Sequence, residues 1–254
     1  MNAAEIAAQL AQARAEARLV RIENLDSLIA SVDDAYRVQS ELAALPGGEV
    51  RGWKVTALSP QDQRKYFAGT PVAGPLFAPY VDNSPASLTL SRFVAPMFEC
   101  EIAFVLGADL PSRPTPYERG EVEAAVAAVV AAFEIPDNRV ATDASALVVL
   151  ADAMGNGAFV VGEPAPRWRD LDLGNIAITL TADNGEHLVG ASGRILGNPF
   201  LALLALANAH PLGAGGLKKG QIVTTGTCTT PVPVRAGAYV GDFGPLGTVR
   251  VRFE

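Results

Sequence analysis

Two glutamates separated by a single residue lie within an apolar stretch, residues 96–106, that has the composition of a β-strand. Side chains alternate between the two faces of a strand, so Glu99 and Glu101 are predicted to share one face, with Cβ atoms roughly 6–7 Å apart. Carboxylates that close repel each other unless one is protonated or a cation lies between them. The pair therefore indicates either a site for a hard divalent cation, which prefers oxygen ligands, or an edge strand with its acidic face in water.

Two further charged residues stand in apolar surroundings and could join this pair. Glu134 follows an apolar run and precedes Ile135-Pro136, so its carboxylate is either exposed at the end of a helix or a metal ligand. Lys54 is the lone ammonium in the strand-like residues 50–55. It is either a solvated residue of an edge strand or, if it lies near anions, a proton carrier or an anchor for a carboxylate.

A threonine-rich run, residues 220–230, is a third candidate and contains Gly226. Its hydroxyl and backbone N–H groups could bind the carboxylate of a substrate, but the same run is also typical of an ordinary β-strand and its turn. The glycine-rich fingerprints of nucleotide-binding sites are absent from the sequence, and so is the GxSxG motif of serine hydrolases.

The composition of the chain narrows the classes of partner and of metal site that we expect. The net charge of −7 and the isoelectric point near 5.0 argue against nucleic acid or an anionic membrane as the main partner. Cys100 and Cys228 are too far apart in the sequence to suggest a thiolate metal site, and they fit a reducing compartment. With His187 and His210 as the only histidines, metal chemistry must rest on oxygen ligands. The sequence predicts neither a signal peptide nor a transmembrane helix, so we expect a cytoplasmic protein.

Hydrophobic periodicity and turn residues predict the elements that must position these groups. Helices are expected over residues 2–18, 24–46, 121–133, 143–153 and 200–209. Strands are expected near residues 50–55, 87–90, 96–106, 158–162, 176–182, 186–190, 222–225, 232–234, 239–241 and 248–253. Asp183-Asn184-Gly185 predicts a hairpin turn, and the Pro- and Gly-rich residues 59–79 predict a loop.

This pattern predicts an α+β fold with a mixed, largely antiparallel β-roll core and flanking helices. Residues 1–60 would form an N-terminal helical cap or oligomerisation region, and residues 61–254 the catalytic domain. One continuous domain is the alternative to this division.

Several short motifs occur in an order that resembles the hydratase and decarboxylase branch of the fumarylacetoacetate hydrolase-like superfamily, which contains 2-oxopent-4-enoate hydratases and 4-oxalocrotonate decarboxylases. The resemblance spans nearly the whole chain. Its motifs are residues 34–39, Gly52-Trp53-Lys54-Val55, residues 99–104, residues 134–137 with Arg139, Ala151-Asp152 before Gly157, Gly197-Asn198-Pro199, and residues 217–220 leading into Thr225-Gly226-Thr227.

The resemblance implies roles for five residues. Glu99, Glu101 and Glu134 would bind Mg²⁺ or Mn²⁺, Lys54 would act in catalysis and substrate binding, and Thr227 would lie in the loop that binds the substrate carboxylate. It also implies a β-roll that assembles into a homo-oligomer, with association with another pathway enzyme as a further option.

The implied reaction is addition of water to a 2-hydroxy-2,4-dienoate in aromatic hydrocarbon catabolism, through a metal-stabilised enolate, to give a 4-hydroxy-2-oxo acid. A 4-oxalocrotonate-type decarboxylase is the alternative within the same chemistry. An alternative of another class is a non-catalytic paralogue or subunit that binds oxo acids. Hydrolases of the superfamily use a His–Glu pair to activate water, and the late positions of His187 and His210 argue against that branch.

The chain also departs from the family pattern. Family hydratases carry acids in the loop after the lysine motif, but residues 71–79 contain none. Thr56 stands where a glycine is common, and residues 151–155 replace the usual Ala-Asp-Asn-Ala-Ser segment. The missing loop acid removes a candidate general acid or base for water addition, which favours the decarboxylase alternative, whereas the expected metal ligands are all present.

Overall fold

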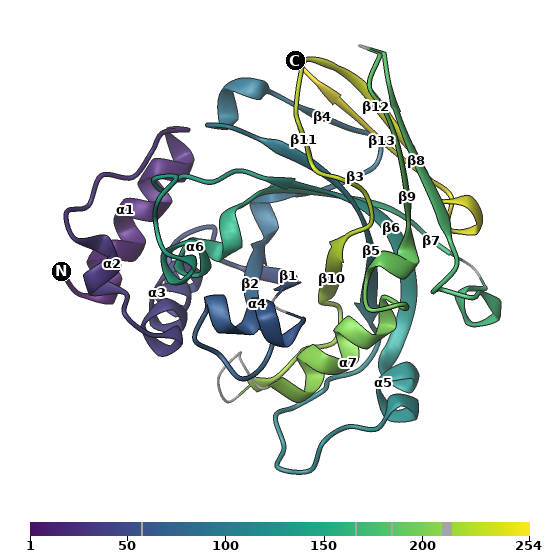
Figure 1. The fold of residues 1–254 in the computed structure, drawn as a ribbon, viewed down its shortest axis with the longest axis horizontal. Coiled ribbons are helices and arrows are strands. Elements are labelled where there is room, and N and C mark those ends of the chain that lie inside the picture. Colours follow the sequence, from purple (N-terminus) through teal and green to yellow (C-terminus); the bar gives the residue numbers. More distant parts are fainter. Residues whose placement is uncertain (57, 166, 184, 210–214) are drawn as a thin grey trace.

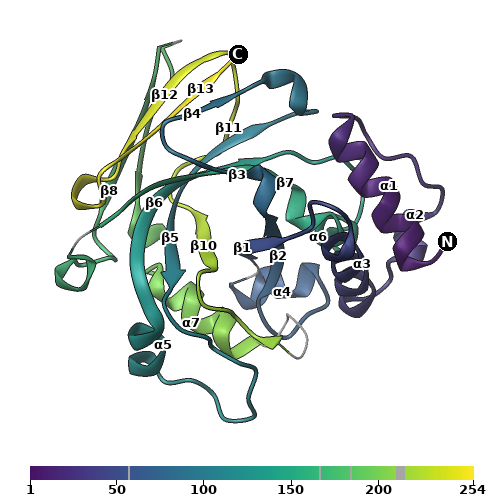
Figure 2. The same cartoon turned by 180° about the vertical axis from the view of Figure 1, so that it is seen from behind.

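The computed structural model describes residues 1–254 except 57, 166, 184 and 210–214 (Figure 1). The described residues form two β-sheets, and the larger one lies at the centre of the molecule. The N-terminal helices gather at one end of the molecule, and the smaller sheet lies at the opposite end, as the view from behind also shows (Figure 2).

The larger sheet contains eight of the described strands in the order β2-β1-β10-β5-β6-β7-β3, with β11 paired to β5. Only the β1–β10 and β3–β7 pairs are parallel, so the sheet is mixed and largely antiparallel, as predicted. The strands are β1 (Val50–Thr56), β2 (Val72–Phe77), β3 (Val81–Asn83), β5 (Met97–Leu106), β6 (Val126–Pro136), β7 (Asn156–Pro164), β10 (Ile222–Thr227) and β11 (Val232–Pro233).

The smaller sheet contains five of the described strands in the order β4-β13-β12-β8-β9. The predicted hairpin is confirmed by the antiparallel pairing of β8 with β9, although Asn184 of its turn lies outside the described residues. The strands are β4 (Ala86–Leu88), β8 (Ala177–Ala182), β9 (His187–Ala191), β12 (Gly237–Asp242) and β13 (Thr248–Phe253).

Aromatic side chains pack between the two sheets. Phe98 of β5 stacks on Tyr239 of β12 at 4.8 Å between ring centroids and meets the edge of Phe133 of β6 at 4.6 Å. Burial of each such ring contributes roughly 2–3 kcal/mol. Because side chains alternate along a strand, the contact of Phe98 and Phe133 with the smaller sheet turns Glu99 and Glu134 toward the opposite, concave face of the larger sheet.

The concave face has a small apolar cluster of its own, so both faces of β5 and β6 are buried. Its buried members come from five strands and are Leu76, Ala103, Val130, Ala132, Phe159, Val161 and Ile222. Ala103 and Ala132 belong to the same alternating rows as Glu101 and Glu134. The acids therefore continue a row of side chains whose other members are apolar and buried.

The described α-helices flank the sheets, and α1, α3 and α6 share a separate hydrophobic cluster. They are α1 (Ala3–Ala15), α2 (Leu25–Leu28), α3 (Val32–Ala44), α4 (Pro60–Lys65), α5 (Arg119–Ala125), α6 (Ala146–Ala151) and α7 (Phe200–Ala209). The helix predicted over residues 200–209 is confirmed by α7. The helix expected over residues 24–46 is two helices, because Ser31 caps a new start by accepting a hydrogen bond from the backbone N–H of Asp34.

Two predicted elements are wrong. The helix expected over residues 121–133 ends at Ala125, and β6 follows, because the β-branched, alanine-rich run is buried on both faces between β5 and β7. The loop expected over residues 59–79 contains α4 and the fully buried strand β2. Pro75 is tolerated in β2 because this strand is an edge of the sheet and pairs only with β1.

The larger sheet also takes a strand from the first sixty residues, since β1 lies between β2 and β10. The division of the chain near residue 60 stays a prediction. In the described ranges, no helix combines the length and apolar character that crossing a bilayer requires.

Candidate metal centre

Strand register brings the three predicted acids together on the concave face. Glu99 lies directly opposite Glu134 in the β5–β6 pair, and Glu101 is two residues further along β5. Each of the three offers a carboxylate oxygen within 4.8 Å of the others. Glu101 and Glu134 are 0% exposed, so the alternatives of a water-exposed edge strand for Glu101 and of an exposed helix end for Glu134 are wrong.

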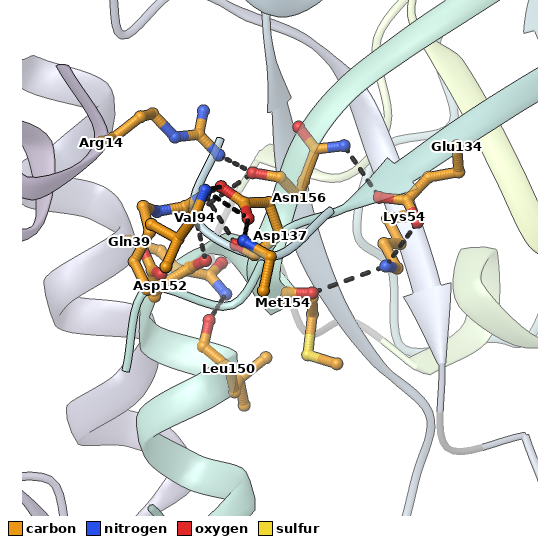
Figure 3. A network of polar contacts seen from close by, with 12 residues as sticks. Arg14, Gln39, Lys54, Val94, Glu134, Asp137, Leu150, Asp152, Met154 and Asn156 are labelled. Carbon is orange, nitrogen blue, oxygen red and sulfur yellow. Dashed lines mark hydrogen bonds and ion pairs between the residues drawn. The ribbon is translucent and has the colours of Figure 1, made fainter. Parts of the chain in front are cut away.

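Lys54 projects from β1 into the same cluster. Its Nζ donates a hydrogen bond to Oε2 of Glu134 at 2.9 Å and lies 3.5 Å from the carbonyl oxygen of Met154 (Figure 3). Burial acts to lower the pKa of Lys54, but the negative charges of Glu134, Glu99 and Glu101 outweigh it and raise the pKa above its ordinary value. The lysine is therefore a charged, proton-holding group at neutral pH.

Glu101 is held by the threonine-rich strand β10 rather than by water. Thr224 donates a short hydrogen bond from Oγ1 to Oε2 of Glu101, and the backbone N–H of Gly226 donates to the same oxygen at 3.1 Å. Oε1 of Glu101 is buried and has no hydrogen-bond partner among the described residues. A buried carboxylate oxygen without a donor is unusual, and a cation is one partner that would satisfy it.

Thr227 lies at the end of β10, where its Cα is paired with that of Glu101. Its Oγ1 donates to the carbonyl oxygen of Thr229 at 3.0 Å and accepts from the backbone N–H of Thr229 at 3.3 Å. These contacts form a tight local turn next to the acids. A role for Thr227 in binding substrate stays a prediction.

Glu134 has a donor on each oxygen. Lys54 binds Oε2, and Nδ2 of Asn156 donates to Oε1 at 3.0 Å (Figure 3). Sequence reasoning missed both Asn156 and Thr224. Thr224 lies within the run that drew attention to Gly226, but no local signal marks Asn156, because its partner is 22 residues away on another strand.

The electrostatics of the cluster favour a bound cation. Burial, with the nearby charges of Glu99 and Glu134, raises the pKa of Glu101 to about 8. Burial also raises the pKa of Glu134 to about 7, against the lowering effect of Lys54. A single ammonium does not balance three carboxylates, and hard divalent cations bind oxygen ligands of this kind. The donor set, the orphaned Oε1 of Glu101 and the close spacing together fit such an ion.

The largest cavity described is elsewhere. It has a volume of about 660 Å³ and lies against α3, β1 and β2, with Tyr36, Trp53 and Pro75 among its lining residues. Neither Lys54 nor any of the three glutamates lines it. We assign the chemistry to the glutamate cluster, because a buried excess of charge requires a partner and a cavity beside an edge strand does not.

Comparisons with known proteins identify the family and the fold of the chain. No protein-family model matches the chain. A 2-keto-4-pentenoate hydratase from Paraburkholderia phymatum is 34% identical over 226 residues, which cover 87% of this chain and 85% of the relative. A 2-keto-4-pentenoate hydratase from Burkholderia vietnamiensis is 31% identical over 255 residues, covering 98% and 97%.

A solved structure extends the similarity to the fold. The 4-oxalocrotonate decarboxylase from Pseudomonas putida G7, complexed with magnesium and adipate, superposes with a TM-score of 0.87 at 24% identity and covers 99% of this chain and 97% of its own. The sequence similarity to the hydratases, together with the shared fold, shows that this chain belongs to the 2-keto-4-pentenoate hydratase family of lyases.

Proposed function

We propose that the protein is a divalent-metal-dependent hydratase that adds water to a 2-hydroxy-2,4-dienoate of the 2-oxopent-4-enoate type and yields a 4-hydroxy-2-oxo acid. The observation that carries the proposal is the meeting of three glutamate carboxylates within 4.8 Å of one another, beside a buried lysine, on a fold whose sequence relatives are hydratases. The product of the simplest substrate would be 4-hydroxy-2-oxopentanoate.

Glu99, Glu101 and Glu134 would hold Mg²⁺ or Mn²⁺, and the magnesium in the related decarboxylase structure supports this choice. When bound, the ion supplies Lewis-acid chemistry, namely positive charge beside the 2-oxygen of an oxo acid. An ion held by three carboxylates would keep free positions at which an oxo acid could bind.

Lys54 would bind and orient the substrate. Its raised pKa keeps a proton on Nζ at neutral pH, which makes the group a charged anchor for a carboxylate rather than a base. The apolar cluster on the concave face would exclude water from one side of the site. Thr227, on the adjoining turn, would bind the substrate carboxylate.

The direct experiment is a turnover assay with 2-hydroxypenta-2,4-dienoate, with identification of the product. We expect activity with Mg²⁺ or Mn²⁺, loss of activity in EDTA, and recovery when metal is added back. Glu163→Gln, on an exposed residue at the end of β7, is the control and should match the wild type. Full activity in EDTA would end the metal-dependent proposal.

The decarboxylase alternative has an observation in its favour. β2 occupies the place of the expected acidic loop, and all six of its residues are buried and free of carboxylates. Release of CO₂ from 4-oxalocrotonate without hydration of the dienoate would select this alternative. Metal binding with turnover of neither substrate would instead support an oxo-acid-binding paralogue.

The same proposal covers the location, the assembly state and the pathway of the protein. We expect a cytoplasmic homo-oligomer that acts in aromatic hydrocarbon catabolism, with residues 1–60 as an oligomerisation region and association with another pathway enzyme as a further option. Cys100 and Cys228 are both free and buried, which supports a reducing compartment. Light scattering of the purified protein would give the assembly size, and a monomer would exclude the homo-oligomer.

A further inference from the structure

Asn156 connects the candidate metal centre to a second buried polar cluster. It is the first residue of β7 and is almost fully buried. Its Nδ2 donates to Oε1 of Glu134 at 3.0 Å and to the carbonyl oxygen of Ala158 at 3.3 Å. Since Lys54 binds the other oxygen, donors from β1 and β7 fix the plane of the Glu134 carboxylate from two sides (Figure 3).

An unusual turn delivers Asn156 to this position. Ala153, Met154 and Gly155 have φ values of 52°, 57° and 62°, so three consecutive residues adopt the left-handed conformation that only glycine takes readily. At Gly155 a Cβ would lie 2.2 Å from Oδ1 of Asn138. Such a backbone persists only where its surroundings hold it.

Arg139 is one of the groups that hold the turn. It is buried, and its Nη2 donates to the carbonyl oxygen of Asn156 at 3.1 Å and pairs with Oδ2 of Asp152 at 3.1 Å. Its Nη1 donates to the carbonyl oxygen of Asp137 at 2.8 Å. Asp137 is itself fixed, because its Oδ1 accepts from the backbone N–H groups of Val94 at 2.9 Å and Ala95 at 2.8 Å.

Arg14 reaches the same carbonyl group from the N-terminal helix α1. Its Nη2 donates a hydrogen bond to the carbonyl oxygen of Asn156 (Figure 3). Its guanidinium lies 4.3 Å from the ring centroid of Tyr80. Two guanidinium groups thus converge on one backbone oxygen, from positions 142 and 17 residues away along the chain.

From these contacts we propose that Asn156 is a positioning residue for Glu134, and that Arg14 and Arg139 act through the Asn156 carbonyl to keep its amide aimed at the carboxylate. The N-terminal helix α1 thereby sets the geometry of a metal ligand that lies on β6. This inference rests on the proposed metal centre, since it assigns Asn156 and Arg14 a role toward the ion that Glu134 would bind.

The test is a titration with Mn²⁺ in which the EPR signal of the free ion is measured. This signal reports the affinity for Mn²⁺ independently of turnover. Asn156→Leu keeps the size of the side chain but removes the donor to Glu134, and we expect a Kd for Mn²⁺ raised about 10- to 100-fold, as for other groups that orient metal ligands. Arg14→Gln should raise the Kd less, by about 3- to 10-fold. Arg14→Lys, which retains a charged donor, should restore most of the affinity.

Arg18→Gln, just beyond α1, is the matched control and should leave the Kd unchanged, because the side chain of Arg18 contacts Glu16 and the carbonyl oxygen of Leu19 at the surface. Wild-type affinity in folded Asn156→Leu would overturn the positioning role. Equal affinity for Mn²⁺ in Arg14→Gln and the wild type would overturn the link to α1. If Asn156→Leu does not fold, the comparison of Arg14→Gln with the wild type decides whether the proposal holds. Failure of the wild type to bind Mn²⁺ would overturn the metal centre itself, and the positioning role with it.

Discussion

Two buried charge clusters lie next to each other in the described part of the chain but differ in their balance of charge. Around Arg139, the guanidinium groups of Arg14 and Arg139 face the carboxylates of Asp137 and Asp152, although Nη1 of Arg14 and Nε of Arg139 have no hydrogen-bond partner among the described residues. Around Glu101, three carboxyl groups share one described cation, Lys54, and Oε1 of Glu101 also has no hydrogen-bond partner there.

The contrast separates a structural role from a functional one. A buried cluster that neutralises its own charge holds a backbone in place, and its loss costs stability. A buried cluster with excess negative charge is unfavourable until a cation arrives, so its loss costs activity. Substitutions in the arginine cluster should therefore act mainly on stability, and substitutions in the glutamate cluster mainly on activity.

Glu101→Gln should have the largest effect, on turnover. Removal of one ligand charge should lower kcat/KM at least about 1,000-fold, about 4 kcal/mol of transition-state stabilisation. The metal-free variant should melt no lower than the wild type at pH 8, because a neutral amide replaces a carboxylate whose pKa is raised by burial. A variant that keeps its activity but melts lower would reverse the assignment.

Arg139→Gln should show the opposite signature. Loss of a buried guanidinium leaves Asp152 without its ion-pair partner and should cost roughly 3–5 kcal/mol of the free energy of unfolding, with or without metal. Urea denaturation measures this change. The control is Arg167→Gln, whose surface pair with Asp170 should contribute less than about 1 kcal/mol. If both substitutions lowered the free energy of unfolding by the same amount, the structural role assigned to the Arg139 cluster would be wrong.

The sequence predicts the parts of this arrangement that depend on residues close together in the chain. It does not predict the parts that depend on partners far apart in the chain. The spacing of Glu99 and Glu101 is local, and strand alternation alone placed both on one face. For Glu134 the sequence leaves open an exposed helix end or a metal ligand, because a run buried on both faces has no period that separates strand from helix. No local signal marks Arg14, since its partner is 142 residues away.

A pH series would sharpen the comparison further. The pKa values of Glu101 and Glu134 are raised to about 8 and about 7, so the metal-free protein favours their protonated forms. The stability that they contribute is present below their ordinary pKa and is lost as pH rises through about 7–8. Metal competes with these protons, so the rise in Tm that Mg²⁺ produces should be larger at pH 8.5 than at pH 6.0. In Glu101→Gln, the difference between the Tm increases at the two pH values should be smaller. If Mg²⁺ raised the Tm of the wild type equally at both pH values, the raised pKa values of Glu101 and Glu134 would be contradicted.

The smallest expected effect concerns the end of α1, the helix that carries Arg14. Ala17 has a φ of 46° in a C-terminal cap where the N–H of Arg18 donates to the carbonyl oxygen of Ala13. Glycine avoids the steric cost of this left-handed position, so Ala17→Gly should stabilise the protein by about 1 kcal/mol. Thermal unfolding would detect the gain, and a fall in Tm would show that the cap does not limit the stability of α1.

The most direct measurement of the central claim is the stoichiometry of Mn²⁺ bound to the wild type and to Glu101→Gln at pH 8. The proposed centre predicts one Mn²⁺ per wild-type chain, displaced by EDTA together with the activity, and a Kd raised at least about 100-fold in the variant. Equal binding by the two proteins, or no binding by a fully active wild type, would contradict it.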